Sequence, residues 1–207
     1  MPGRHHLSGL CLVTDRKASG MSCEEMTVAA LDAGAGWIQY REKEKNRREA
    51  YYEAVKLRGM TRKAGALFVV NDHADIALAV DADGLHLGQD DLPLNEARRV
   101  VGKRIIGIST HSLPEAILAQ EEGADYIGFG PVFRTSTKDA GEPKGVELLH
   151  EIRRHVKIPV VAIGGISLEN LSSVLDAGAD GVAVASAIFR GNIHENVRSF
   201  MKGLRGR

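Results

Sequence analysis

The sequence contains only two cysteines, Cys11 and Cys23, and neither their number nor their spacing suits a disulfide framework or a zinc site. Free thiols persist in a reducing cytoplasm. No apolar run approaches the length of a membrane-spanning helix, and the first ten residues show no secretory signal pattern. These features predict a cytoplasmic globular protein without a membrane partner.

Neither sign of charge is in excess, because 27 lysines and arginines balance 27 aspartates and glutamates. The composition therefore predicts no nucleic-acid partner, although local charge can still bind a phosphorylated small molecule. With 207 residues, 43% of them hydrophobic, the chain is long enough for one globular domain of barrel size. We expect small-molecule substrates, and the sequence leaves a homodimer open.

Short apolar or β-branched runs alternate with helical patterns along the whole chain. This alternation predicts a parallel sheet, and the number of units favours a single α/β domain with the closed (β/α)8 TIM barrel fold. The domain is expected to span 1–207, with a short N-terminal extension over about 1–8. The expected strands are 10–14, 37–41, 67–71, 84–88, 104–109, 126–130, 159–164 and 181–186. The expected helices are 22–34, 47–65, 74–80, 94–102, 113–123, 146–156, 168–178 and 194–204.

A repeated phrase supports the barrel. The segments DAGAGWIQ, EEGADYIG and DAGADGVA each place a glycine between a helical pattern and the following strand. Glycine readily adopts the left-handed conformation that ends a helix. In such barrels the active site lies where the strands run into their following loops, whereas residues that precede a strand usually stabilise the opposite end. The expected topology therefore sorts polar residues by position.

Six aspartates lie within the stretch FVVNDHADIALAVDADGLHLGQDD. Asp81 and Asp83 come just before a predicted strand, so we expect them at the stabilising end, in turns or helix caps. Asp75 falls in the first turn of a predicted helix, where a carboxylate interacts favourably with the helix dipole. None of these three aspartates is predicted to take part in catalysis.

The other three aspartates, Asp72, Asp90 and Asp91, directly follow two neighbouring predicted strands. Adjacent strands lie about 5 Å apart, so these carboxylates can converge. A set of carboxylate oxygens without cysteine favours Mg²⁺, which takes one or two protein carboxylates and completes its shell with water and phosphate. Solvated loop acids, or salt bridges to Arg41 and Lys43, are the alternative, and position alone does not decide between them.

The segment WIQYREK places Gln39, Arg41 and Lys43 at alternating positions. If the strand persists, these side chains emerge on one face at its end. An amide, a guanidinium and an ammonium group together suit a polyanion better than a single carboxylate. The alternative is a solvent-facing strand end that pairs with the nearby aspartates.

A second group of candidate anion-binding residues follows the last three predicted strands. The loop GFGPVFRTSTKDAG contributes hydroxyl groups and a lysine, and AIGGIS and VAVASAI follow the seventh and eighth strands, whose loops commonly bind phosphate through backbone N–H groups. Between the two groups, the fifth strand ends in GISTHS, with Ser109 and His111. Two anion sites and a candidate Mg²⁺ site in one barrel mouth indicate an enzyme that joins two phosphorylated molecules.

Several of these segments, in order along almost the whole chain, resemble the thiamine-phosphate synthase family: QYREK, FVVND, DGLHLGQDD, IIGISTHS, GADYIGFGPVF with TSTK, and VVAIGGI. The resemblance implies a transferase of thiamine biosynthesis. It would join hydroxymethylpyrimidine diphosphate to (phosphoethyl)thiazole, or to its carboxylated form, with one Mg²⁺ ion. The products would be thiamine phosphate and pyrophosphate, formed by a dissociative, carbocation-like substitution.

The resemblance also implies roles for individual residues. Metal ligands would be Asp72 and Asp91. The residues that contact the pyrimidine diphosphate would be Gln39, Tyr40, Arg41, Glu42, Lys43, Asn71, Ser109 and Lys138, with Arg41, Lys43, Ser109 and Lys138 acting in catalysis. The residues that hold the thiazole phosphate would be Thr135, Ser136, Thr137, Gly165, Ala185 and Ser186.

Two alternatives stay open at this point. A thiazole tautomerase-like isomerase would use His111 as a general acid and base, without Mg²⁺. A non-catalytic phosphate-binding barrel would keep the sites without turnover. The intact Gln39, Asp91 and Lys138 favour the synthase over both. One position departs from the family pattern, because Arg134 stands where the family often has proline.

Overall fold

The computed structural model describes residues 7–135 and 141–205. Its strands form a closed barrel in chain order, and each strand is parallel to both neighbours. The strands are β1 (Gly9–Val13), β2 (Trp37–Tyr40), β3 (Leu67–Asn71), β4 (Gly84–Leu87), β5 (Ile105–Thr110), β6 (Tyr126–Phe129), β7 (Val160–Ile163) and β8 (Gly181–Val184). The predicted (β/α)8 barrel is therefore confirmed.

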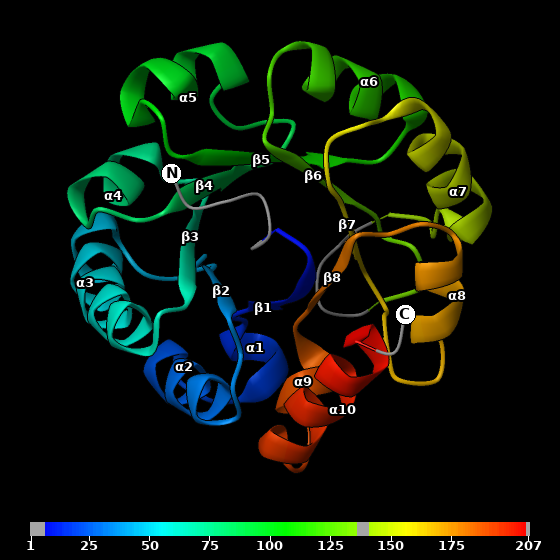
Figure 1. Cartoon of the computed structure of the whole chain (residues 1–207). Coiled ribbons are helices and arrows are strands. Elements are labelled where there is room, and N and C mark those ends of the chain that lie inside the picture. Colours follow the sequence, from blue (N-terminus) through cyan, green and yellow to red (C-terminus); the bar gives the residue numbers. More distant parts are fainter. Residues whose placement is uncertain (1–6, 136–140, 206–207) are drawn as a thin grey trace.

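The helices surround the strands as an outer ring (Figure 1). They are α1 (Arg16–Ser19), α2 (Cys23–Asp32), α3 (Arg47–Ala64), α4 (Ala74–Ala79), α5 (Leu94–Val101), α6 (Leu113–Glu121), α7 (Gly145–His155), α8 (Leu171–Asp176), α9 (Ser186–Phe189) and α10 (Ile193–Arg205). The sequence predicted all of these except α1 and α9. Each of those two helices has four residues, too few to show a helical repeat of apolar positions.

Apolar side chains form two layers, one inside the barrel and one between the strands and the helices. The alternation along β2 shows how: Trp37 points into the barrel, whereas Ile38 and Tyr40 face the helices. Inside, the Trp37 and Tyr126 rings meet edge to face at 5.3 Å. Gly107 makes room for this pair, because a Cβ atom there would lie 2.1 Å from the Tyr126 ring.

The end of the barrel where the strands begin is closed by turns and apolar packing. Gly34, Gly123 and Gly178, the glycines of the repeated phrase, have φ angles of 94°, 91° and 95°, as expected for residues that end a helix. Leu7, within the expected N-terminal extension, is buried in the interior cluster.

Aspartates stabilise this same end in a repeated way. Asp83, Asp125 and Asp180 each precede an even-numbered strand, and each accepts a hydrogen bond from a backbone N–H of the preceding strand, at 2.8 to 2.9 Å. Each also pairs with an arginine. Asp83 has the tightest pair, two hydrogen bonds of 2.7 and 2.9 Å to Arg58. Asp83 therefore ties a strand to a helix, a role that the prediction of a turn or cap did not include.

The remaining bottom and helix-start aspartates are more exposed. Asp81 pairs with Arg62 and Arg104 but keeps 68% of its side chain exposed. Asp75 lies in the first turn of α4, as predicted, and forms an exposed pair with Arg47 at 3.3 Å.

Replacing Asp83 by asparagine is expected to lower the free energy of unfolding by about 2 kcal/mol, because the buried Arg58 then loses its carboxylate partner. Thermal or urea unfolding measures the loss, and turnover should stay unchanged because Asp83 is at the end opposite the barrel mouth. Asp75→Asn is the control, with an expected loss of about 0.5 kcal/mol or less for an exposed pair. Equal losses in the two variants would contradict this assignment.

Candidate functional site

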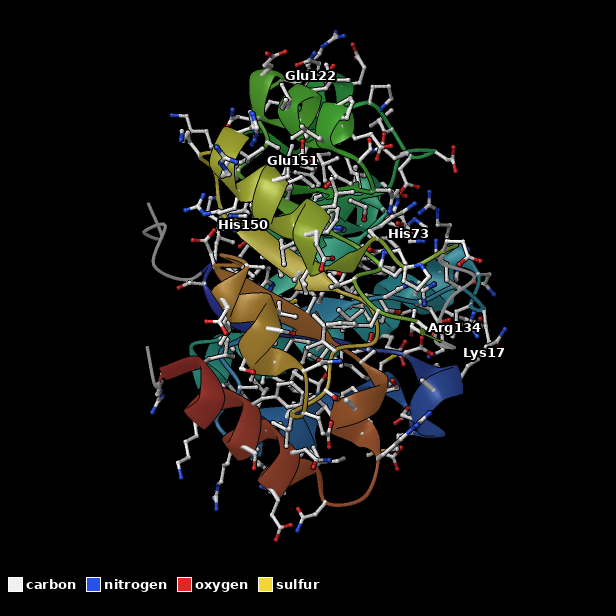
Figure 2. The ribbon with its side chains drawn as sticks, turned by 90° about the vertical axis from the view of Figure 1, so that its right-hand side faces the viewer. Lys17, His73, Glu122, Arg134, His150 and Glu151 are labelled. Carbon is white, nitrogen blue, oxygen red and sulfur yellow. The ribbon has the colours of Figure 1, made fainter. Side chains whose placement is uncertain are left out.

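The loops that follow the strands enclose a cavity of about 420 Å³ at the other end of the barrel. Lys17, His73 and Arg134, each from a segment that follows a strand, lie together at this end (Figure 2). A volume in this range suits a small-molecule site. The predicted site residues that line the cavity are Arg41, Ser109, Thr135, Gly165, Ala185 and Ser186.

Side chains of the segment QYREK alternate between the mouth and the outer layer. Gln39 and Arg41 line a small cavity inside the barrel below the mouth. Arg41 also lines the mouth, where its guanidinium lies 3.5 Å from the Asp15 carboxylate. Lys43 pairs with Asp72. Gln39 and Arg41 therefore share a face, and Lys43 reaches the Asp72 carboxylate.

Tyr40 and Glu42, expected to contact the pyrimidine diphosphate, have side chains on the opposite face. Tyr40 is 1% exposed, and its hydroxyl group donates a hydrogen bond to Glu53 of α3 at 2.8 Å. Glu42 is 7% exposed, with its carboxylate close to Cys23 and Glu53. The period of two along an extended segment turns these two side chains away from the mouth. Their contact with the pyrimidine diphosphate stays a prediction.

Asp72 and Asp91 meet at the rim beside Lys43. Asp72 has a φ angle of 64°, which turns the chain sharply after β3, and the Asn71 amide donates a hydrogen bond to it at 2.5 Å. Asp91 accepts a hydrogen bond from the Gly88 N–H at 2.7 Å. Burial, together with the contact to the Asp72 carboxylate, raises the pKa of Asp91. Asp90 is exposed.

This pair of carboxylates fits a hard divalent cation. Two acidic oxygen donors in contact repel each other unless a proton or a cation lies between them. The Lys43 ammonium group supplies part of that positive charge in this structure. Oxygen donors of this kind are what Mg²⁺ prefers. Of the two interpretations of these aspartates from the sequence, the salt bridge to Lys43 forms at Asp72, and the metal site stays a prediction.

A buried polar chain beneath the mouth was not predicted from the sequence. His86 on β4 points into the barrel, with Nδ1 2.8 Å from the Tyr126 hydroxyl and Nε2 2.9 Å from the Ser109 hydroxyl. Gln39 contacts the same tyrosine. The sequence contains one signal for this polar chain, because His86 stands at an inward position of the otherwise apolar strand GLHL. Ser109, which lines the mouth, is therefore oriented from below by His86.

The other side of the mouth is formed by the loops after β6, β7 and β8. The loops after β6 and β7 lie against each other, and the Phe133 N–H donates a hydrogen bond to the Gly164 carbonyl oxygen at 3.0 Å. Gly165 permits this close contact, because a Cβ atom there would lie 2.5 Å from the Arg134 carbonyl oxygen. Thr135 and Ser186 line the cavity near this contact. Ser136, Thr137 and Lys138 lie outside the described residues.

Two arginines and a histidine add to this side of the cavity. Arg134, where the family often has proline, is exposed and lines the cavity. Arg190, just after α9, also lines it, and the sequence analysis did not single it out. His111 is a lining residue whose Nδ1 lies 2.5 Å from the Gly130 carbonyl oxygen. Positively charged side chains therefore line both sides of the mouth, Arg41 on one side and Arg134 and Arg190 on the other.

The sequence and the fold were compared with known proteins. The family model for thiamine monophosphate synthase matches residues 10–188. The thiamine-phosphate synthase of Chloroflexus aurantiacus is 51% identical over 181 residues, which cover 86% of this chain and 84% of that protein. That of Pelotomaculum thermopropionicum is 47% identical and covers 90% and 85%.

A solved structure agrees with these matches. The thiamine phosphate pyrophosphorylase from Pyrococcus furiosus superposes with a TM-score of 0.90 at 41% identity, covering 98% of both chains. Most of the chain is thus similar in sequence and in fold to transferases of thiamine biosynthesis. The chain belongs to the thiamine monophosphate synthase family.

Proposed function

We propose that the protein joins hydroxymethylpyrimidine diphosphate to (phosphoethyl)thiazole and releases pyrophosphate. With the carboxylated form of the thiazole as substrate, CO2 would be released as well. The observation that carries the proposal is a single cavity with two anion-binding sides. Arg41 borders one side, and Gly165 and Ser186 border the other. Asp72 and Asp91, which meet beside Lys43, are not among the described residues that line the cavity. Two phosphorylated substrates bound on these sides would meet in the middle of the mouth.

The diphosphate would bind on the side of β2 to β4. Arg41 and Lys43 would bind its oxygens, and Gln39 and Asn71 would orient the pyrimidine; the resemblance adds Lys138 to the diphosphate contacts. Asp72 and Asp91 would hold Mg²⁺, which when bound supplies positive charge to the diphosphate oxygens. Arg41, which lines the cavity, and Lys43, which pairs with Asp72, support this half of the site.

The thiazole phosphate would bind on the side of β6 to β8. Backbone N–H groups near Gly165, Ala185 and Ser186 would donate to its oxygens, together with the Thr135 hydroxyl and those of Ser136 and Thr137. The unpaired N–H groups of a helix start favour an anion. Arg190 and Arg134 at the rim would add positive charge.

In the reaction, the bond between the pyrimidine methylene carbon and the diphosphate oxygen breaks, and the electron pair leaves with pyrophosphate. Arg41, Lys43 and Lys138 would stabilise the negative charge that develops on this leaving group. The electron-rich pyrimidine delocalises the positive charge on the methylene carbon, and the thiazole nitrogen attacks it with its lone pair. Ser109, oriented by His86, would hold the pyrimidine in line, so positioning and electrostatics carry the reaction.

A cytoplasmic location is part of the proposal. Both cysteines are buried and unpaired, which suits a reducing cytoplasm. Within residues 7–135 and 141–205, no helix has the length and apolar character needed to cross a membrane. A homodimer is compatible with the proposal, which needs the loops of only one barrel.

The test is a reaction of the purified protein with both phosphorylated substrates and Mg²⁺. Thiamine phosphate and pyrophosphate should form in equal amounts, measured by chromatography and a coupled phosphate assay. A control with the thiazole phosphate alone tests the isomerase alternative, in which His111 would act without the diphosphate. A folded preparation that isomerises the thiazole but forms no thiamine phosphate would contradict the proposal.

A further inference from the structure

Residues 40–45 divide their side chains between the mouth and a buried space behind it. Arg41 lines the mouth and Lys43 pairs with Asp72, whereas Tyr40, Glu42 and Lys45 enter the space between β2 and the helices α2 and α3. The segment is thus held from behind by the residues that do not face the site. The function of those anchors is not explained by substrate contact.

Glu42 makes the anchor that lies between the two cations. One of its oxygens accepts hydrogen bonds from the backbone N–H groups of Glu44 at 2.7 Å and Lys45 at 3.3 Å. Its side chain is 2% exposed. A carboxylate that accepts two N–H groups of the following residues closes a tight turn, and this turn carries Lys43. The side chain therefore sets the path of the chain just after Arg41.

The second oxygen of Glu42 is buried, and none of the residues that the structure describes donates a hydrogen bond to it. The nearest cation is the Arg16 guanidinium, 3.7 Å away. Burying a carboxylate oxygen without a hydrogen-bond donor is unfavourable. The hydrogen bonds that the other oxygen accepts from Glu44 and Lys45 must therefore offset this cost. This observation singles out Glu42 from the exposed acids of the same segment.

The floor of this space is formed by Glu53 and Cys23. Glu53 accepts hydrogen bonds from the Tyr40 hydroxyl at 2.8 Å and from the Lys45 ammonium group at 2.6 Å. Burial, and next the charge of Glu53, raises the pKa of the Cys23 thiol to about 12, so the thiol stays protonated. Lys45 and Arg16 thus balance the two glutamates, and the chain itself supplies the cations for this cluster.

Arg41 is also tied down from the neighbouring strand. Its N–H donates to the Thr14 hydroxyl at 2.9 Å, and that hydroxyl lies 3.2 Å from the Arg41 carbonyl oxygen, to which it can donate. The backbone is therefore fixed at Arg41 by Thr14 and at residues 44 and 45 by Glu42. Lys43 lies between these two fixed points.

We propose that Glu42 is a positioning residue, whose buried carboxylate fixes the segment 41–45 so that Arg41 and Lys43 face the diphosphate side of the mouth. The inference rests on the proposed function, because it assumes that these two cations bind the diphosphate. It gives Glu42 a role that needs no side-chain contact with the substrate. Loss of the carboxylate frees the turn, and the two cations lose their common orientation.

The test compares Glu42→Ala and Glu42→Asp with the matched control Glu44→Ala. Glu44 lies in the same turn, but its side chain is 51% exposed and pairs with Lys17 at 3.2 Å. We expect Glu42→Ala to raise the KM for the pyrimidine diphosphate by about 10- to 100-fold, because small displacements of a positioned group are costly. The KM of Glu42→Ala for the thiazole phosphate should change by about twofold or less. In Glu44→Ala, the KM values for both substrates should also change by about twofold or less.

Glu42→Asp keeps the charge but shortens the side chain, so its carboxylate cannot reach both N–H groups. It should shift the KM for the diphosphate in the same direction by about tenfold, and it decides the matter if Glu42→Ala does not fold. Calorimetric titration with inorganic pyrophosphate and Mg²⁺ should show a parallel loss of affinity. Circular dichroism and thermal unfolding establish that each variant is folded.

Folded Glu42 variants with unchanged pyrophosphate affinity would overturn the inference. An equal rise in both KM values would also overturn it, because that pattern indicates general damage to the barrel. Arg41→Ala separates this failure from failure of the proposed function. If Arg41→Ala weakens pyrophosphate binding and the Glu42 variants do not, the positioning role alone is wrong. If Arg41→Ala has no effect, the assignment of the diphosphate side is wrong.

Discussion

Replacing Asp91 by asparagine is expected to reduce Mg²⁺-dependent formation of thiamine phosphate by about 100-fold or more. The substitution removes one of the two carboxylates proposed to hold the cation. An asparagine oxygen can still accept the hydrogen bond that Asp91 accepts from Gly88 at 2.7 Å, so the turn after β4 should keep its shape. The loss should therefore fall on metal binding, measured as turnover across a Mg²⁺ titration.

The control for this prediction is Asp81→Asn, at the opposite end of the barrel. Asp81 has a φ angle of 53°, which asparagine tolerates well, and its side chain is 68% exposed. Its turnover and Mg²⁺ dependence should stay within about twofold of the unsubstituted protein. Similar turnover in the two variants would show that the separation of the aspartates by barrel end does not predict their roles.

Replacing Gly165 by alanine is expected to raise the KM for the thiazole phosphate by about 100-fold. Gly165 has a φ angle of 65°, and a Cβ atom there would lie 2.5 Å from the Arg134 carbonyl oxygen and 2.8 Å from Phe133 Cβ. The loops after β6 and β7 would have to separate, which displaces the backbone N–H groups proposed to bind the phosphate. Steady-state kinetics with each substrate varied in turn measures the effect.

Gly191→Ala is a matched control for backbone strain. Gly191 has a similar φ angle of 72°, but a Cβ atom there meets nothing within 4 Å. Both variants share the cost of a left-handed alanine, about 1 kcal/mol, and only Gly165→Ala adds a clash. The KM for the pyrimidine diphosphate should change by about threefold or less in both. If Gly191→Ala impaired thiazole binding as much as Gly165→Ala, strain alone would explain the loss.

Much of the fold could be predicted from local patterns. The alternation of apolar runs and helical repeats placed all eight strands of the barrel in order. Most strand ends differ from the prediction by one or two residues, since hydrogen bonds to neighbouring strands decide where pairing stops. Helices α1 and α9 were missed, because four residues carry no periodic signal.

The candidate site was predicted where the chain alone sets a direction. Gln39 and Arg41 share a face because an extended chain has a period of two, and Asp72 meets Asp91 because β3 and β4 are adjacent. The same period implies the outward direction of the Tyr40 and Glu42 side chains, and the contact with the pyrimidine diphosphate that the resemblance implies for these two residues stays a prediction.

Sequence order and chemistry were sufficient for the barrel, for the separation of top from bottom aspartates, and for the family. Other features required contacts between elements that are distant in the chain. His86 reaches Ser109 from another strand, and Glu42 meets Cys23 and Glu53 from two helices. Local periodicity specifies which face a side chain takes, whereas its partners depend on how strands and helices close around the barrel. For that reason the anchor behind Arg41 and Lys43 became visible only in three dimensions.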